Sequence, residues 1–176
     1  MEYNTIQTLE GAWTVDFDTK WGGPGEVTFS ELTDWTSHPD KGIKYYSGTA
    51  VYKKSFKTTF DKKTDKRYFL QLGDVKDVGI ASIRLNGKDK GIVWTKPFRV
   101  EVTDDLTDGD NILEVEVVNS WYNRVAGDEM SATPHKYTKT NIVLGHDFRG
   151  ASLKDIPLEP SGLLGLVTIS TGEASD

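Results

Sequence analysis

The chain has 176 residues, enough for one domain with a hydrophobic core, and its formal net charge of −6 argues against nucleic acids and anionic membranes as partners. It has no cysteine, which excludes disulfides and thiolate metal sites, and no apolar run approaches the length of a membrane span. Aromatic residues make up 11% of the chain and include five tryptophans, which can fill a core or provide flat faces for stacking on sugar rings.

The first third of the chain predicts strands separated by loops. Trp13, Val15 and Phe17 alternate with polar residues, which is typical of a strand with one buried face. The glycine-rich stretch 22–25 indicates a loop, because it cannot continue a strand. A short strand is expected at 27–29, and a long strand at 45–56 in which a glycine would mark a bulge.

The middle of the chain, from 68 to 128, shows the clearest alternation. Apolar and polar residues exchange places with a period of two, as in strands with one buried and one solvated face. The dipeptide Asn86-Gly87 tolerates the positive φ angles that a tight hairpin needs. The expected strands cover residues 68–75, 83–91, 93–103 and 111–118.

The remaining segments contribute less regular structure. The charge run at 61–67 indicates a solvated connection, and 130–154 indicates a long excursion with a short strand at 141–144. A last strand is expected at 163–169, and the small polar tail from about residue 171 is expected to be disordered. We find no amphipathic helix and no internal repeat, so residues 1–176 are expected to form a single β-sandwich domain of eight to ten strands.

Several motifs of this chain resemble those of one known module, the galactose-binding-like (family 2 type sugar-binding) domain of glycoside hydrolases. The form attached to family 106 α-L-rhamnosidases is particularly similar. The resemblance covers about residues 9–169 and implies an all-β fold, a jelly-roll β-sandwich that is galactose-binding-domain-like. The motifs are Leu72-Gly73-Asp74-Val75, Leu85-Asn86-Gly87-Lys88, Gly91-x-x-Trp94-x-x-Pro97-Phe98, Trp121-x-Asn123-Arg124-x-x-Gly127-Asp128-Glu129 and Ser161-Gly162-Leu163-Leu164-Gly165.

The resemblance implies a chain that is not an enzyme as an isolated domain but belongs to, or derives from, an α-L-rhamnosidase-like glycoside hydrolase. In the enzymes it resembles, the catalytic acids lie in a separate barrel domain. The implied partners are a carbohydrate and that catalytic domain, and a monomer secreted or periplasmic with the parent enzyme is expected. The first residues do not form a signal peptide. No cofactor is required, although related jelly-rolls often hold a structural calcium ion, whose ligands the sequence does not assign.

The residues themselves offer weak alternatives for catalysis and metal binding. Glu114 and Glu116 share a strand face about 7 Å apart, a separation that suits an inverting glycosidase, but a solvated strand face is the preferred interpretation. The segment 104–110 loosely resembles a calcium loop in the wrong register. No spacing singles out zinc ligands or a nucleophilic triad, and the histidines are scattered, at His38, His135 and His146.

Carbohydrate binding needs aromatic faces that stack on sugar rings and polar groups that take paired hydroxyls. The candidates with that chemistry are Trp94, Trp121, Tyr122, Asn123, Arg124 and Asp128. Trp21 and Trp35, in predicted loops, are further candidate platforms. Trp94 precedes Pro97-Phe98 and has a second interpretation as a core residue.

The stretch 121–129 is expected to be a loop with either a functional or a structural role, and the structural role is slightly preferred. Gly127 would permit a sharp turn that brings Asp128 back to Arg124, whose guanidinium would grip the carboxylate with two hydrogen bonds. With Asn123, this pair would present a polar edge beside Trp121. In the structural alternative, the pair locks the loop or docks it to a catalytic domain.

Three functions compete on these grounds. The first is a non-catalytic carbohydrate-binding module of a glycoside hydrolase, binding plant or algal polysaccharide. The next is a structural accessory domain that braces a catalytic barrel without binding sugar. The last is a small complete glycosidase or lyase. Because sites rather than folds carry function, this order rests partly on analogy.

Overall fold

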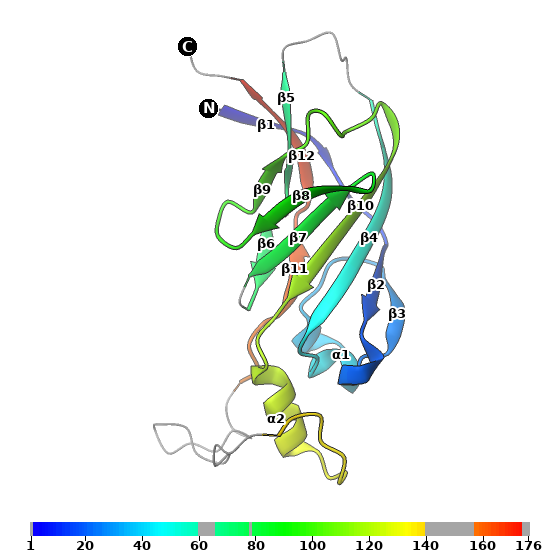
Figure 1. Ribbon diagram of the computed structural model, residues 1–176, viewed down its shortest axis with the longest axis vertical. Helices are drawn as coiled ribbons and strands as arrows, with labels where there is room; N and C mark the ends of the chain where they lie inside the picture. The colour runs from blue at the N-terminus through cyan, green and yellow to red at the C-terminus, as the bar shows by residue number, and fades with distance from the viewer. Residues whose placement is uncertain (1, 60–65, 78, 140–156, 174–176) are drawn as a thin grey trace.

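The computed structural model describes residues 2–59, 66–77, 79–139 and 157–173. This part of the chain is a sandwich of antiparallel sheets with few and short helices, so the prediction of an all-β sandwich is confirmed (Figure 1). The helical segments are η1 (Thr19–Trp21), η2 (Trp35–Ser37), α1 (Lys41–Lys44) and α2 (Tyr122–Met130).

The larger sheet has six strands in the order β3-β2-β4-β10-β7-β8. Its centre is the pair β4 and β10, which runs in unbroken antiparallel register from Thr49 opposite Val118 to Thr58 opposite Gly109. The strands are β2 (Trp13–Phe17), β3 (Gly25–Phe29), β4 (Thr49–Thr58), β7 (Ile80–Leu85), β8 (Lys88–Val93) and β10 (Gly109–Val118).

The opposite layer consists of a four-stranded sheet in the order β1-β12-β5-β9 and a two-stranded sheet in which β11 pairs with β6. Both ends of the described chain lie in the four-stranded sheet, because β1 pairs with β12 along its length. The strands are β1 (Glu2–Thr8), β5 (Arg67–Gln71), β6 (Asp74–Lys76), β9 (Arg99–Glu101), β11 (Gly162–Gly165) and β12 (Thr168–Glu173).

One hydrophobic core joins the layers. In β10, Leu113, Val115 and Val117 are buried, whereas the intervening glutamates point outward, as the period of two predicts. Side chains of the smaller sheet, such as Leu70 and Ile169, belong to the same buried cluster. The alternation read from the sequence therefore encodes the face that each strand turns to the core.

The hairpin between β7 and β8 is confirmed. Asn86 and Gly87 both have positive φ, 51° and 78°, the combination that a tight turn between twisted strands requires. The amide of Asn86 also donates to the side chain of Asn111 and to the carbonyl of Asp105. The turn is thus fixed by conformation and by hydrogen bonds.

Several strand boundaries were predicted wrongly. The described residues contain twelve strands rather than eight to ten, because the expected strands 68–75 and 163–169 each divide between two sheets and because β1 was missed. Residues 45–48 precede β4, so Gly48 lies outside the strand, and the pairing of β4 with β10 contains no bulge. The tail is paired as far as Glu173, since β12 bonds to both β1 and β5. The expected strand at 141–144 lies outside the described residues.

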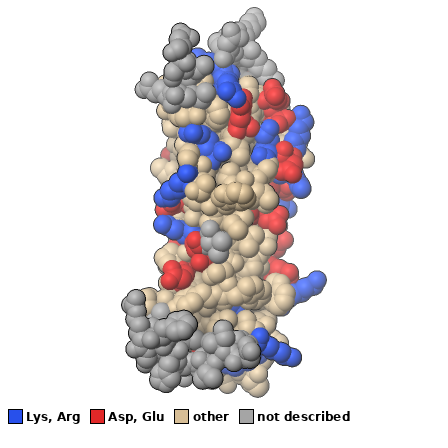
Figure 2. All heavy atoms as spheres, turned by 60° about the vertical axis from the view of Figure 1, so that its left-hand side comes forward, with Lys and Arg blue, Asp and Glu red and all other residues tan. Residues whose placement is uncertain are grey.

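The outer surface is mixed in charge. Figure 2 shows lysine, arginine, aspartate and glutamate side chains interspersed over the upper part of the face in view, without a large field of one sign. No helix of the described residues is long and apolar enough to cross a membrane.

Candidate functional site

The predicted loop at 121–129 is a helix. After β10, residues Tyr122–Met130 form α2, which caps one end of the sandwich (Figure 1). The buried positions of α2 include Asn123, Arg124 and Asp128, so its inner face is polar. Because the buried face of α2 is polar, the sequence lacks the apolar residues at helical spacing that predict a helix.

Gly127 has a different role from the predicted one. It lies inside α2 and makes no sharp turn. A Cβ at this position would lie 2.6 Å from Cβ of Tyr45, so the glycine lets α2 pack closely against the residue that follows α1. The sequence singled out Gly127 but did not predict that its role is close packing against Tyr45.

Asn123 is fully buried and bonded to the chain itself. Its Nδ2 donates to the carbonyl of Glu159 at 2.7 Å and to Oγ of Ser161 at 3.0 Å, and its Oδ1 accepts from the backbone N–H of Glu159 at 2.9 Å. Both ends of the amide are therefore engaged. This geometry fits the structural alternative, because the amide is not presented at the surface.

The predicted clasp between Arg124 and Asp128 is not present. Oδ2 of Asp128 accepts from both the backbone N–H and the hydroxyl of Thr138, each at 2.7 Å. The guanidinium of Arg124 lies instead over the ring of Tyr137, with 4.7 Å between Cζ and the ring centroid. Since the two side chains point to neighbouring residues of the segment after α2, the structure describes no ion pair between them.

Arg124 is the unusual member of this set. It is only 5% exposed, and its Nε and Nη2 have no hydrogen-bond partner in the described part of the chain. Burial lowers the pKa of this guanidinium, while the nearby charge of Asp128 opposes that effect. Buried donors without partners are rare in folded proteins, so this group needs an explanation.

Arg124 borders a cavity of about 670 Å³, which we call the α2 hollow. The cavity lies between α1, α2 and the segment 131–137. Volumes of this size are typical of small-molecule sites. The side chains that matter below are those of Lys41, Tyr45, Arg124, Asp128, His135 and Tyr137.

Two tryptophans that are far apart in the sequence, Trp21 and Trp121, form a ring pair at the start of α2. Trp121 immediately precedes the helix, and its ring meets that of Trp21 edge to face, with centroids 5.0 Å apart. The two residues remain 42% and 39% exposed. Trp21 is followed directly by Gly22, which borders the α2 hollow, so the tryptophan pair and the hollow belong to the same end of the molecule.

The other predicted aromatic residues are dispersed. Trp94 is 72% exposed in the segment after edge strand β8, so its interpretation as a core residue is wrong. Trp35 is fully buried and its Nε1 donates to the hydroxyl of Tyr52 at 2.6 Å, which excludes it as a binding platform. Tyr122 is half-buried, and its hydroxyl donates to the carbonyl of Pro157 at 3.4 Å.

The carboxylates considered for catalysis lie on the solvated face of the larger sheet. Glu114 is flanked by two cations, Lys53 at 3.8 Å and Arg84 at 3.6 Å. With Glu116 it borders a shallow cavity of about 300 Å³. The sequence predicted a solvated strand face, and the structure adds that Glu114 is salt-bridged on it.

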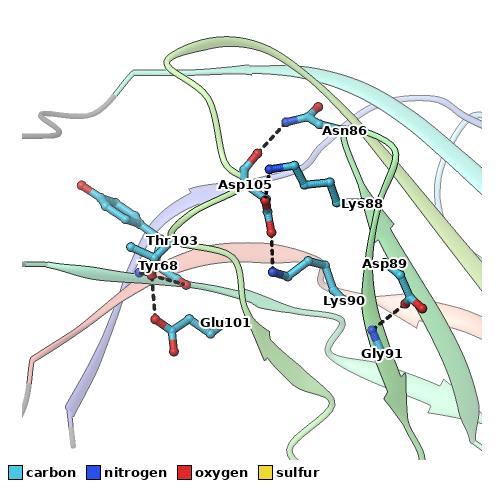
Figure 3. Close-up of polar contacts among 9 residues, drawn as sticks. All are labelled: Tyr68, Asn86, Lys88, Asp89, Lys90, Gly91, Glu101, Thr103 and Asp105. Atoms are coloured by element: carbon cyan, nitrogen blue, oxygen red, sulfur yellow. Dashed lines mark hydrogen bonds and ion pairs between the residues drawn. The ribbon is translucent and has the colours of Figure 1, made fainter.

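The loop considered for calcium is stabilised by lysines. Lys88 and Lys90, at alternate positions of β8, both point to the carboxylate of Asp105, with N–O distances of 2.7 and 2.5 Å (Figure 3). Hydrogen bonds from Lys88, then Lys90, lower the pKa of Asp105. A carboxylate already neutralised by two ammonium groups does not fit a calcium site. The structural calcium ion stays a prediction without assigned ligands.

The described histidines make ring contacts. His38 stacks on Phe29 with centroids 5.5 Å apart, and His135 meets Tyr137 edge-on at 4.6 Å. Among the residues that the structure describes, no group of three or more histidines and carboxylates could hold a metal ion. His146 lies outside them.

Comparisons with known proteins point to one class. No family model matches the chain. A protein of Formosa agariphila, provisionally named a beta-glucuronidase, is 38% identical over 150 residues, covering 85% of this chain and 12% of its own length. The structure of a rhamnosidase from Novosphingobium sp. PP1Y matches with a TM-score of 0.86 and 32% identity, over 98% of this chain and 15% of that one.

A more distant likeness concerns the fold alone. The beta-glucuronidase of an uncultured Clostridium species has a TM-score of 0.54 at 24% identity, over 66% of this chain and 22% of that one. This chain therefore spans less than a quarter of the length of each of these relatives. Together the matches support a domain associated with glycoside hydrolases.

Proposed function

We propose that this chain is a non-catalytic, carbohydrate-binding accessory domain of a glycoside hydrolase, a single domain of the galactose-binding-like jelly-roll kind. The observation that carries the proposal is the exposed tryptophan pair at the α2 end. Each ring presents apolar surface to solvent, and such surface stacks on the C–H face of a sugar. The substrate class would be a plant or algal polysaccharide.

The buried polar contacts of α2 support this proposal indirectly. Asn123 and Asp128 fix the helix to Glu159 and Thr138, so Trp121 starts from a rigid element. A ring that is already held in place loses little conformational entropy when a ligand binds. The residues expected to contact sugar would then act as positioning residues for a neighbouring aromatic face.

The protein partner of this domain would be the catalytic domain of its parent enzyme. The small share of each glycoside hydrolase relative that this chain covers supports such a partner. Secretion or export to the periplasm with the parent enzyme, and a monomeric domain, would accompany that arrangement. The α-L-rhamnosidase-like assignment draws support from the rhamnosidase match, although beta-glucuronidases match as well.

The alternative function is a brace that packs against the catalytic domain without binding sugar. Exposed apolar side chains favour it, because such surface is typical of interfaces when it is contiguous. Leu166 is 74% exposed, and Ile92 and Trp94 are exposed as well. Binding measurements on the isolated domain separate the two functions.

The decisive experiment combines affinity electrophoresis with tryptophan fluorescence over a panel of plant and algal polysaccharides. We expect dissociation constants of roughly 10 μM to 1 mM, since one stacked ring and a few hydroxyl contacts replace good contacts with water. Trp121→Ala should abolish binding, whereas Trp94→Ala serves as a matched control and should bind like the wild type. Both variants should keep the wild-type melting temperature.

Two outcomes would contradict the proposal. A flat response of the wild type across the whole panel favours the brace. Loss of binding in Trp94→Ala with retention in Trp121→Ala places the binding surface at the edge strand β8 and removes it from α2.

A further inference from the structure

Trp21 and Trp121 form a corner rather than a flat platform. Their ring planes are inclined by 82° and their centroids lie 5.0 Å apart, so the edge of one ring touches the face of the other. In such a contact, one face of each ring borders the same space. The two residues are 39% and 42% exposed, so each ring has surface that a ligand can reach.

The right angle limits how a sugar chain can use the two rings. Two units of an extended chain can stack on two rings only if the faces of those rings are turned the same way and stand apart from each other. The tryptophan pair meets neither condition, because its rings are nearly perpendicular and in contact. A sugar ring that stacks on one indole therefore meets the other indole with its edge.

The backbone of Trp21 is fixed by its surroundings. Trp21 ends η1, and its N–H donates to the carbonyl of Asp18 at 3.2 Å. Gly22 follows with a φ of 78°, and a Cβ there would lie 2.6 Å from Cζ of Tyr137, so the chain packs directly on the tyrosine ring. The guanidinium of Arg124 lies over the same ring, which gives this buried group a structural role beside Trp21.

The backbone of Trp121 is fixed as well. It precedes α2, and its carbonyl accepts from the N–H of Val125 at 3.0 Å. The N–H of the preceding residue, Ser120, donates to Oδ2 of Asp77 at 2.7 Å. With both backbones held, turning either ring about its side-chain bonds would break the contact between the rings. The corner is therefore formed before a ligand arrives.

In the described part of the chain, the pair is not extended into a row of exposed aromatic rings. The other exposed aromatic residue of that part is Trp94. It follows β8, and β7 separates β8 from β10, the strand that leads to Trp121. The described surface thus offers one aromatic corner at the α2 end rather than a line of stacking sites.

We propose that the tryptophan pair binds a single sugar unit, the end of a chain or a one-unit branch, in the corner between its rings. This inference rests on the proposed function and specifies which part of a polysaccharide the site takes. One unit gains contact with both indoles, whereas the units attached to it project away from the pair. Affinity should depend on the identity of that unit and not on the length of the chain.

The test measures affinity against chain length. The polysaccharide that binds best in the panel described above is partially hydrolysed, and its fragments are separated by size from one to six sugar units. Each fraction is titrated into the full chain in a calorimeter. We expect the dissociation constants of the one-unit and six-unit fractions to agree within about threefold, because a second stacked unit would raise the affinity roughly tenfold.

Variants show whether both rings serve the same unit. Trp21→Ala should weaken the one-unit and six-unit fractions by the same factor, about fivefold or more, whereas in a two-unit site it would weaken the longer fragment more. Trp21→Phe keeps a ring in the corner and should retain most of the affinity, which separates loss of the ring from loss of the fold. Trp94→Ala is the control and should change neither fraction.

An affinity that rises about tenfold or more from one unit to six would overturn this inference and leave the proposed function intact. A polysaccharide that binds only when intact would do the same. Fragments that bind equally to the wild type, Trp21→Ala and Trp121→Ala would place the sugar away from the pair and end the single-unit site. If no polysaccharide of the panel binds, the proposed function fails and this inference fails with it.

Discussion

Asn123 holds α2 to the segment that enters β11 through both ends of its amide. The two hydrogen bonds to the backbone of Glu159 resemble a strand pairing, and Ser161 provides a third contact. Buried amides satisfied in this way stabilise one conformation, because removing them leaves backbone groups without partners. The residue is therefore a positioning group rather than a ligand contact.

Asn123→Ala should destabilise the protein by about 2 kcal/mol, because it removes a fully buried amide together with its three hydrogen bonds to Glu159 and Ser161. The melting temperature should fall by about 4–8 °C, measured by circular dichroism. Gln7→Ala removes a surface amide that donates to the carbonyl of Lys57, and should change the melting temperature by less than about 2 °C. Equal effects of the two changes would mean that Asn123 does not lock α2.

At the scale of elements, the sequence predicts the strands better than it predicts the helix α2. β10 could be predicted because Leu113, Val115 and Val117 alternate with polar residues. α2 could not, because the residues that it buries include Asn123 and Arg124, which resemble surface residues. The polar side chains on its inner face make hydrogen bonds and ring contacts with distant segments. A local sequence pattern does not reveal those partners.

Tertiary contacts also explain why the exposure of two tryptophans was predicted wrongly. Trp35 looked like a loop residue, but its ring stacks on Tyr52 and both are fully buried. Trp94 precedes an apolar motif and nevertheless faces solvent. The sequence thus predicted the aromatic content of the candidate site but not which rings are accessible.

α2 allows a prediction about its packing. Alanine is a better helix former than glycine by about 1 kcal/mol, so Gly127→Ala would stabilise an isolated helix. In the folded protein the new Cβ would lie 2.6 Å from Cβ and Cγ of Tyr45, and overpacking of this kind costs about 1–3 kcal/mol. We expect the steric cost to prevail, with a melting temperature lowered by about 2–8 °C in calorimetry.

The control for this prediction is Val125→Ala in the same helix, at a half-buried position. It should change the melting temperature by less than about 4 °C. If Gly127→Ala raises the melting temperature, α2 does not pack against Tyr45 as described, and the wall of the α2 hollow has to be reconsidered.

At the scale of the whole molecule, acidic residues on several elements are paired with cations. Hydrogen bonds from Lys88 and Lys90 hold the pKa of Asp105 below its usual range, and a hydrogen bond from Arg67 does the same for Glu101. These pairs link β8 to the segment before β10, and β5 to β9. Because the pKa of both carboxyl groups is lowered in the folded protein, the stability of the sandwich depends on pH.

The direction of that dependence follows from proton linkage. A carboxyl group with a lowered pKa in the folded state binds fewer protons than in the unfolded chain, so its pairing stabilises the fold above the unfolded pKa of about 4. That stabilisation is lost as pH falls through the folded pKa. The melting temperature should therefore decrease as the pH is lowered from about 5 to 2.

Asp105→Asn tests the contribution of one carboxylate to this behaviour. The variant should melt below the wild type at neutral pH, because Lys88 and Lys90 lose their common partner. The difference should shrink as the pH is lowered, because protonation removes the same charge from wild-type Asp105. Asp110→Asn is the control, since the carboxylate of Asp110 makes an exposed contact of 3.6 Å with Lys57. A difference for Asp105→Asn that stays constant from pH 7 to pH 2 would show that its lysine pairs do not cause the acid sensitivity.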